Sequence, residues 1–226
     1  MIHYLVAIYY RIIIIINDLF NTSIYKKIKN EYQAIQLGKK HNYVSGSNVY
    51  LGKYLNEEVI IKGFDIFNLY KNEINILNIL NQSNFVPGIL KVSKKYFIEE
   101  YVDGQTFDEY LKENMVNDKI LKQIIEYLDY LYSYKIVHRD IRPENIIINR
   151  ENIKVIDYGC AIKVDNNSFK FPLRVEKTLG EKYKNHEYWD DASSFYNILK
   201  PYVKDDNEFL LEIKKREKRL IYERES

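Results

Sequence analysis

The chain has very little cysteine and few histidines. Cys160 is the single cysteine among 226 residues, so no disulfide forms within the chain and a reducing compartment is favoured. The four histidines show no metal-ligand spacing with it, which argues against a zinc site. The pattern G-x-x-x-x-G-K-[S/T] does not occur either, and its absence excludes a P-loop NTPase.

The chain also lacks a strong excess of charge of either sign. Lysine and arginine number 34 against 32 aspartates and glutamates, a formal net charge of +2, so nucleic acid is not expected as a partner. With 46% hydrophobic and 29% charged residues, the composition is that of a soluble globule. A chain of this length buries one good core, which we expect two small lobes of a cytoplasmic protein to share.

One long apolar run covers residues 2–16 and is interrupted by His3 and Arg11. A membrane-spanning helix needs about 20 apolar residues, so the run predicts a packed N-terminal helix, with a peripheral membrane contact as the alternative. No small-residue cleavage site of the usual kind follows it, and we therefore do not expect a cleaved signal peptide. A second helix is predicted over residues 21–40, ending near Gly38.

The most informative stretch lies between residues 136 and 159. Two apolar runs, residues 146–148 and 153–156, flank a short polar segment and predict a β-hairpin. Asp140 and Asn145 precede this hairpin, and Asp157 follows it. A hairpin with such side chains at its mouth is suited to hold a divalent cation and a proton acceptor side by side.

This stretch resembles two motifs of protein kinases. Residues 138–145, His-Arg-Asp-Ile-Arg-Pro-Glu-Asn, resemble the catalytic loop, and residues 157–159, Asp-Tyr-Gly, resemble the metal-binding D-F-G. The resemblance implies that Asp140 accepts the proton of a substrate hydroxyl, while Asn145 and Asp157 hold Mg²⁺ on the phosphates of ATP. Arg142 stands where serine/threonine kinases have a lysine, and it is expected to neutralise charge on the transferring phosphate. A buried histidine with a few loop acids would explain one tripeptide, but not both motifs at this spacing.

A lysine and a glutamate upstream fit the same resemblance. Residues 59–62, Val-Ile-Ile-Lys, resemble the V-A-I-K strand, and a helix is predicted over residues 66–81. Glu73 falls on the apolar face of that helix, where a carboxylate is costly unless it is paired. Lys62 is the natural partner and would contact the α- and β-phosphates of ATP; the alternative places Glu73 at a solvent-exposed edge.

The expected nucleotide pocket departs from the kinase pattern in two places. Residues 43–64 predict a strand, a turn and two more strands, with Gly46 and Val49 where a glycine-rich loop would bind phosphates. Only part of G-x-G-x-x-G-x-V is present there. Residues 95–104 resemble the hinge between lobes, and Glu100 and Val102 would offer backbone groups to adenine. Glu99 would then gate the back pocket, where an apolar residue is commoner.

The remaining segments predict mostly helices. A short helix should run from Thr106 or Asp108 to about residue 114, and an amphipathic core helix should cover residues 118–134. Beyond Gly159 the resemblance holds only in outline: residues 177–183 resemble the end of an activation segment, and Glu187 the end of A-P-E. A helix beginning near residue 190 would let Asp191 brace the catalytic loop. A charged helix is predicted over residues 207–224.

These patterns together predict an α+β fold of the bilobal protein-kinase-like type, with a small β-rich N-lobe and a truncated helical C-lobe. The expected division is an apolar, helical N-terminal extension over residues 1–41, the N-lobe over 42–102 and the C-lobe over 103–226. The resemblance covers about residues 42–199.

The resemblance implies an ATP- and Mg²⁺-dependent phosphotransferase acting on a hydroxyl group. The complete H-R-D and R-P-E-N motifs favour a serine/threonine protein kinase. The reduced C-lobe and the apolar N-terminus favour instead a kinase of sugars or lipopolysaccharide. The poor glycine loop supports a third hypothesis, a nucleotide-binding pseudokinase, although every catalytic side chain is present. The expected partners are therefore ATP and a protein or saccharide hydroxyl, with no nucleic acid.

Overall fold

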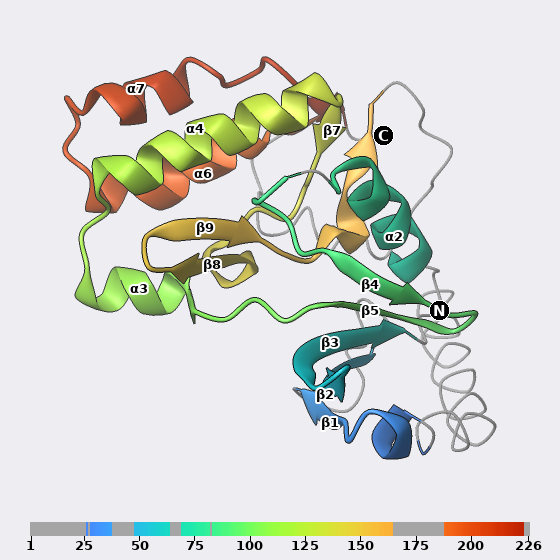
Figure 1. The fold of residues 1–226 in the computed structure, drawn as a ribbon. Coiled ribbons are helices and arrows are strands. Elements are labelled where there is room, and N and C mark those ends of the chain that lie inside the picture. Colours follow the sequence, from blue (N-terminus) through green and yellow to red (C-terminus); the bar gives the residue numbers. More distant parts are fainter. Residues whose placement is uncertain are drawn as a thin grey trace, which may run out of the picture.

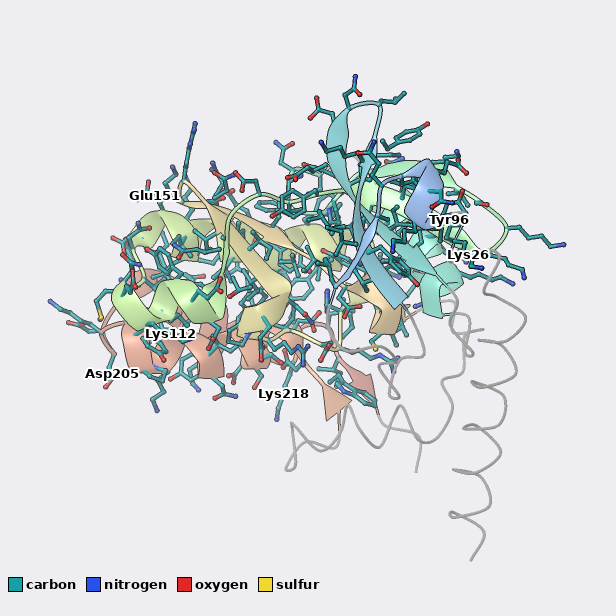
Figure 2. All side chains as sticks on the ribbon, turned by 90° about the horizontal axis from the view of Figure 1, so that it is seen from below. Lys26, Tyr96, Lys112, Glu151, Asp205 and Lys218 are labelled. Atoms are coloured by element: carbon teal, nitrogen blue, oxygen red, sulfur yellow. The ribbon has the colours of Figure 1, made fainter. Side chains whose placement is uncertain are left out.

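The computed structural model describes residues 26, 28–37, 48–63, 69–81, 83–164 and 188–223. A five-stranded sheet lies at one end of the molecule and a group of helices at the other, with a β-hairpin between them (Figure 1). The side chains of Lys26 and Tyr96 lie with the sheet, and those of Lys112 and Asp205 lie at the helical end (Figure 2). The sheet and the helices thus form two regions joined by one extended segment.

The sheet is antiparallel and has the order β1-β2-β3-β5-β4. Its strands are β1 (Ile35–Leu37), β2 (Asn48–Tyr54), β3 (Glu57–Gly63), β4 (Ile89–Val92) and β5 (Tyr96–Glu100). Leu55 and Asn56 both have positive φ, 51° and 69°, which allows the tight turn between β2 and β3. The register sets Val49 and Phe97 opposite Lys62, so these three side chains share one face.

The predicted helix over residues 21–40 is wrong in its second half. The described helical residues end at Glu31, Gln33 has φ 49°, and β1 then pairs with β2. Tertiary packing explains the difference, because Ile28 and Tyr32 are buried with Tyr50, Tyr96 and other residues on one face of the sheet. The sheet therefore includes residues assigned above to the N-terminal extension. The predicted strands over residues 43–64 correspond to β2 and β3, and the third strand lies earlier, at β1.

The helical region packs around α4 (Asp118–Ser133), whose buried face confirms the predicted core helix. Asn117 caps it by accepting the backbone N–H of Ile120 at 3.0 Å. The other helices of this region are α3 (Phe107–Glu113), α6 (Asp191–Leu199) and α7 (Glu208–Lys214). Helices α4, α6 and α7 lie side by side (Figure 1). In the part of the chain that the structure describes, no helix is long and apolar enough to cross a bilayer; residues 2–16 lie outside that part.

The predicted helix over residues 207–224 is too long, since α7 ends at Lys214. Lys218 has φ 62° and donates its backbone N–H to Asp190 Oδ2 at 2.7 Å, which turns the chain. Arg216 holds the turn by a two-pronged contact with Asp129, at 2.8 and 3.0 Å. The chain then forms β12 (Tyr222–Glu223) against β11 (Tyr188–Trp189). These tertiary contacts outweigh the helical preference of the charged sequence.

The predicted hairpin is present as β8 (Ile146–Asn149) and β9 (Asn152–Val155). Arg150 and Glu151 form its turn, with φ of 45° and 67°. Gln123 of α4 fixes the turn by accepting Ile153 N–H at 3.1 Å and donating to the carbonyl of Glu151 at 2.6 Å. The smaller elements around it are β6 (Gln105–Thr106), β7 (Ile136–Val137), β10 (Ile162–Lys163) and the 3₁₀ turns η1 (Pro143–Asn145) and η2 (Tyr158–Cys160).

Candidate active site

A buried carboxylate, that of Asp191, holds the loop of residues 138–145 in place. Asp191, in the first turn of α6, accepts the backbone N–H of His138 at 2.6 Å and that of Arg139 at 3.1 Å. Asp190, the residue before it, caps α6: its side-chain oxygen Oδ1 accepts the backbone N–H of Ser193. This cap fixes the start of the helix and so the position of Asp191. The predicted bracing role of Asp191 is therefore seen in the geometry.

His138 is fully buried and serves as an internal brace of the same loop. Its Nδ1 accepts the backbone N–H of Asp140 at 3.3 Å, so its Nε2 carries the proton and donates to the carbonyl of Ile156 at 3.2 Å. The ring lies 4.6 Å from that of Tyr158. Burial lowers the pKa of His138 from 6.5 to about 4, so the imidazole is neutral at physiological pH.

Asp140 and Asn145 are linked directly. Asn145 Nδ2 donates to the Asp140 carboxylate oxygen Oδ2 at 3.0 Å and to the Asp140 carbonyl at 2.9 Å. The amide nitrogen is thereby committed to Asp140, which leaves the Asn145 Oδ1 oxygen for another partner. Arg142 Nε lies 3.8 Å from both Asp140 Oδ2 and Glu144 Oε2, so a positive charge stands beside the predicted proton acceptor.

The hairpin brings Asp157 to the same place. Ile146 pairs with Val155, and the ladder continues as Ile156 N–H donates to the carbonyl of Asn145 at 2.9 Å. Asp157 follows immediately, is exposed, and has φ 65°. A left-handed conformation is uncommon for a residue other than glycine, and it turns the chain sharply out of β9 into η2. The structure thus assembles Asp140, Asn145 and Asp157 at one end of the hairpin.

Lys62 on β3 is buried between two carboxylates. Its Nζ lies 2.7 Å from Glu73 Oε1 on α2 (Leu69–Ile79) and 2.7 Å from Glu99 Oε1 on β5. The Lys62–Glu73 ion pair was predicted from the sequence, and Glu73 is buried instead of lying at an exposed edge. The second pair, with Glu99, was not predicted. A signal for it exists in the sequence, because a glutamate inside an otherwise apolar strand needs a cationic partner.

The charges at this cluster do not balance. Burial alone lowers the pKa of Lys62, but the carboxylates of Glu73, Glu99 and Asp157 more than offset this and raise it, so Lys62 stays protonated. Burial raises the pKa of Glu73 to about 8 and also raises that of Glu99, and Lys62 offsets only part of each shift. One lysine cannot neutralise every carboxylate that surrounds it.

Side chains of helix α2 also form hydrogen bonds with the Asp-Tyr-Gly segment and with Ala161. Glu73 Oε1 accepts the backbone N–H of Tyr158 at 3.1 Å. Asn72, which is buried, donates to the carbonyls of Gly159 at 3.0 Å and Ala161 at 2.8 Å. Sequence reasoning missed Asn72, although it lies four residues before the buried Ile76 on the helix. These bonds join α2, and with it the Lys62–Glu73 ion pair, to the segment that carries Asp157.

Comparison with known proteins decides the family. A model of the protein kinase domain matches residues 27–185, which is more than half of the chain. The chain belongs to the protein kinase family. The predicted α+β, bilobal protein-kinase-like fold is thereby confirmed, with β1–β5 and α2 as the β-rich lobe.

Several curated kinases are similar to parts of this chain. MAP kinase kinase kinase SSK2 of Saccharomyces cerevisiae is 34% identical over 127 residues, which cover 51% of this chain and 8% of SSK2. The probable serine/threonine-protein kinase mkcE of Dictyostelium discoideum is 34% identical over 125 residues, 49% of this chain and 18% of mkcE. The probable serine/threonine-protein kinase PknB of Lactococcus lactis is 33% identical over 82 residues, 34% of this chain and 13% of PknB. This chain spans less than a fifth of the length of these three relatives.

Kinases use Mg²⁺ with ATP, and the residues at the hairpin mouth suit that ion. Asp157 offers an exposed carboxylate, and Asn145 offers the amide oxygen that its bond to Asp140 leaves over. Among the described residues, no group of three or more His, Cys, Asp or Glu is arranged to hold a metal. Mg²⁺ characteristically takes one or two protein carboxylates together with substrate phosphates and water, so this small set of hard oxygen donors fits it.

The predicted nucleotide-binding residues are only partly described. Val49 faces the same side of the sheet as Lys62, whereas Gly46 lies outside the described residues. The backbone N–H of Glu100 donates to the carbonyl of Gly88 at 2.8 Å, so that group is not available to a base. Val102 is half-buried in the extended segment that follows β5. Residues 177–183 and Glu187 also lie outside the described part of the chain.

Proposed function

We propose that this kinase transfers the γ-phosphoryl group of ATP to serine and threonine hydroxyls of proteins, using Mg²⁺. The observation that carries the proposal is the bond between Asn145 and Asp140 at the hairpin mouth, directly beside Asp157. A proton acceptor and two oxygen ligands at one point are what phosphoryl transfer to a hydroxyl requires. Bound Mg²⁺ would supply neutralisation of the phosphate charge.

Each residue has a role in this proposal. Asp140 orients the acceptor hydroxyl and takes its proton, and the bond from Asn145 keeps its carboxylate in place. Lys62, held by Glu73, contacts the α- and β-phosphates. Asn145 and Asp157 would hold Mg²⁺ through their side-chain oxygens. Arg142, half-exposed beside Asp140, neutralises negative charge on the phosphate in transit.

Serine and threonine are favoured as acceptors by two lines of support. The catalytic loop contains both H-R-D and R-P-E-N, and two of the relatives carry the name serine/threonine-protein kinase. A pseudokinase is disfavoured, because the Lys62–Glu73 pair and the Asp140–Asn145 bond are both formed. A saccharide acceptor and a membrane contact of residues 2–16 have no support beyond the sequence patterns described above.

The test is a transfer assay with γ-labelled ATP and Mg²⁺. Three peptide libraries, each with only serine, threonine or tyrosine as acceptor, are offered beside saccharide and lipid fractions, and Asp140→Asn serves as the blank. We expect label in the serine and threonine libraries, absent with Asp140→Asn. Label that appears only in tyrosine peptides, saccharide or lipid, and that is absent with Asp140→Asn, would show that serine and threonine are not the acceptors. If no fraction carries label that depends on Asp140, the pseudokinase is favoured.

A further inference from the structure

Glu99 is a buried acidic residue on β5, the strand next to the one that carries Lys62. It lies on β5, is 3% exposed, and puts its Oε1 2.7 Å from Lys62 Nζ. Glu73 lies at the same 2.7 Å distance from the same nitrogen, so the two carboxylates share one ammonium group. An ammonium has three N–H donors, and two of them are directed to glutamates before any phosphate arrives.

The two carboxylates differ in what else they hold. Glu73 Oε1 also accepts the backbone N–H of Tyr158, so it connects Lys62 to the segment carrying Asp157. Glu99 connects Lys62 to β5 instead, and its other oxygen, Oε2, is buried with no hydrogen-bond partner. A buried carboxylate oxygen without a donor is costly, and it leaves Glu99 less firmly bound than Glu73. Glu73 therefore supports the active arrangement, while Glu99 does not.

We propose that Glu99 competes with ATP phosphates for Lys62 and so weakens nucleotide binding. The inference deepens the proposed function and rests on Lys62 being the phosphate contact. Its consequence is that this kinase needs more ATP to fill its site than it would with an apolar residue at position 99.

Electrostatics favours the competition. Lys62 already faces the carboxylates of Glu73, Glu99 and Asp157, and the incoming phosphates add more negative charge. The single positive charge of Lys62 must then stabilise all of these anions. The carboxylates and the phosphates also repel one another strongly, because the site is partly desolvated. Removing the Glu99 charge leaves the Lys62–Glu73 pair and its link to Tyr158 in place. Removing this one charge should therefore raise nucleotide affinity about tenfold, which corresponds to about 1.4 kcal/mol of binding free energy.

The experiment measures the affinity of the full chain for Mg·ADP and Mg·ATP by calorimetry, with transfer kinetics in parallel. Glu99→Gln keeps the shape of the side chain and removes its charge, and Glu99→Met replaces it with an apolar chain that suits the buried strand. Glu58→Gln removes an exposed carboxylate from the strand that carries Lys62 and serves as the matched control. Thermal unfolding of each variant establishes that it is folded.

We expect Kd and the KM for ATP to fall about tenfold in a folded Glu99 variant, with kcat little changed and Glu58→Gln like wild type. Unchanged or weaker nucleotide binding in the folded Glu99 variants would overturn the inference and reduce Glu99 to a structural residue. A different result would contradict the proposed function: wild type that binds nucleotide but transfers no label, whatever the affinity of the Glu99 variants.

Discussion

Asp191 accepts the backbone N–H of His138 at 2.6 Å, across 53 positions of sequence. The same carboxylate accepts Arg139 N–H, so one buried side chain holds two successive amides of the catalytic loop. Replacing Asp191 by leucine would leave both amides buried and unpaired. We expect Asp191→Leu to lower the free energy of unfolding by about 3 kcal/mol, measured by urea denaturation.

The control for that measurement is Asp108→Asn. Asp108 is exposed and pairs with Lys112 one helical turn away on α3, so its loss should change the free energy of unfolding by less than about 0.5 kcal/mol. Equal effects of the two substitutions would contradict the bracing role assigned to Asp191.

The buried, neutral state of His138 predicts a pH dependence of stability. Its pKa is lowered to about 4 in the folded protein, so between pH 6.5 and 4 the unfolded chain binds a proton that the folded protein does not. Stability from this residue is therefore fully present above pH 6.5 and is lost as the pH falls towards 4, by up to about 3 kcal/mol. The difference between wild type and His138→Gln, followed by urea unfolding from pH 7 to 4.5, isolates this contribution. A difference that does not vary with pH would refute it.

Lys62→Met tests the charge imbalance around the lysine. Without the ammonium, Glu73 and Glu99 remain buried, and at pH 8 their ionised forms have no cation at 2.7 Å. We expect this variant to lose about 3–5 kcal/mol of stability at pH 8 and clearly less at pH 6, because protonation relieves buried carboxylates. Lys53→Met, at an exposed position of β2, is the control. The same loss at both pH values would show that the two glutamates are not the source of the cost.

Asp157→Ala tests the predicted metal ligand. The exposed carboxylate beside Asn145 is expected to join Mg²⁺ to the ATP phosphates, so its loss should remove the Mg²⁺ dependence of nucleotide binding. The readout is the rise in melting temperature on adding ATP, with and without Mg²⁺. A variant that ATP stabilises as well as wild type, with the same metal dependence, would show that Asp157 is not a ligand.

Much of this site could be predicted because its signals are local. The hairpin follows from two apolar runs around a polar turn, and the burial of Glu73 follows from helical spacing. Asp191 was identified through the resemblance of its helix to the kinase pattern. All of these depend on residues close together in sequence or on an established motif.

The parts that escaped prediction depend on contacts between distant segments. The Lys62–Glu99 pair arises because β3 and β5 are neighbours in the sheet, and the Asn72 bonds arise because α2 packs on η2. Residues 35–37 form a strand because β2 offers them an edge, against a local preference for helix. Local sequence patterns do not determine which of two competing structures tertiary packing will select.

The central claim is that Asp140 takes the proton of the acceptor hydroxyl while other residues bind the nucleotide. The most direct test measures single-turnover phosphoryl transfer and Mg·ATP affinity on the same preparations of wild type and Asp140→Asn. We predict nearly equal affinity and a transfer rate at least about a hundredfold lower in Asp140→Asn. Equal transfer rates in the two proteins would contradict the assignment of Asp140 and, with it, the mechanism proposed for this site.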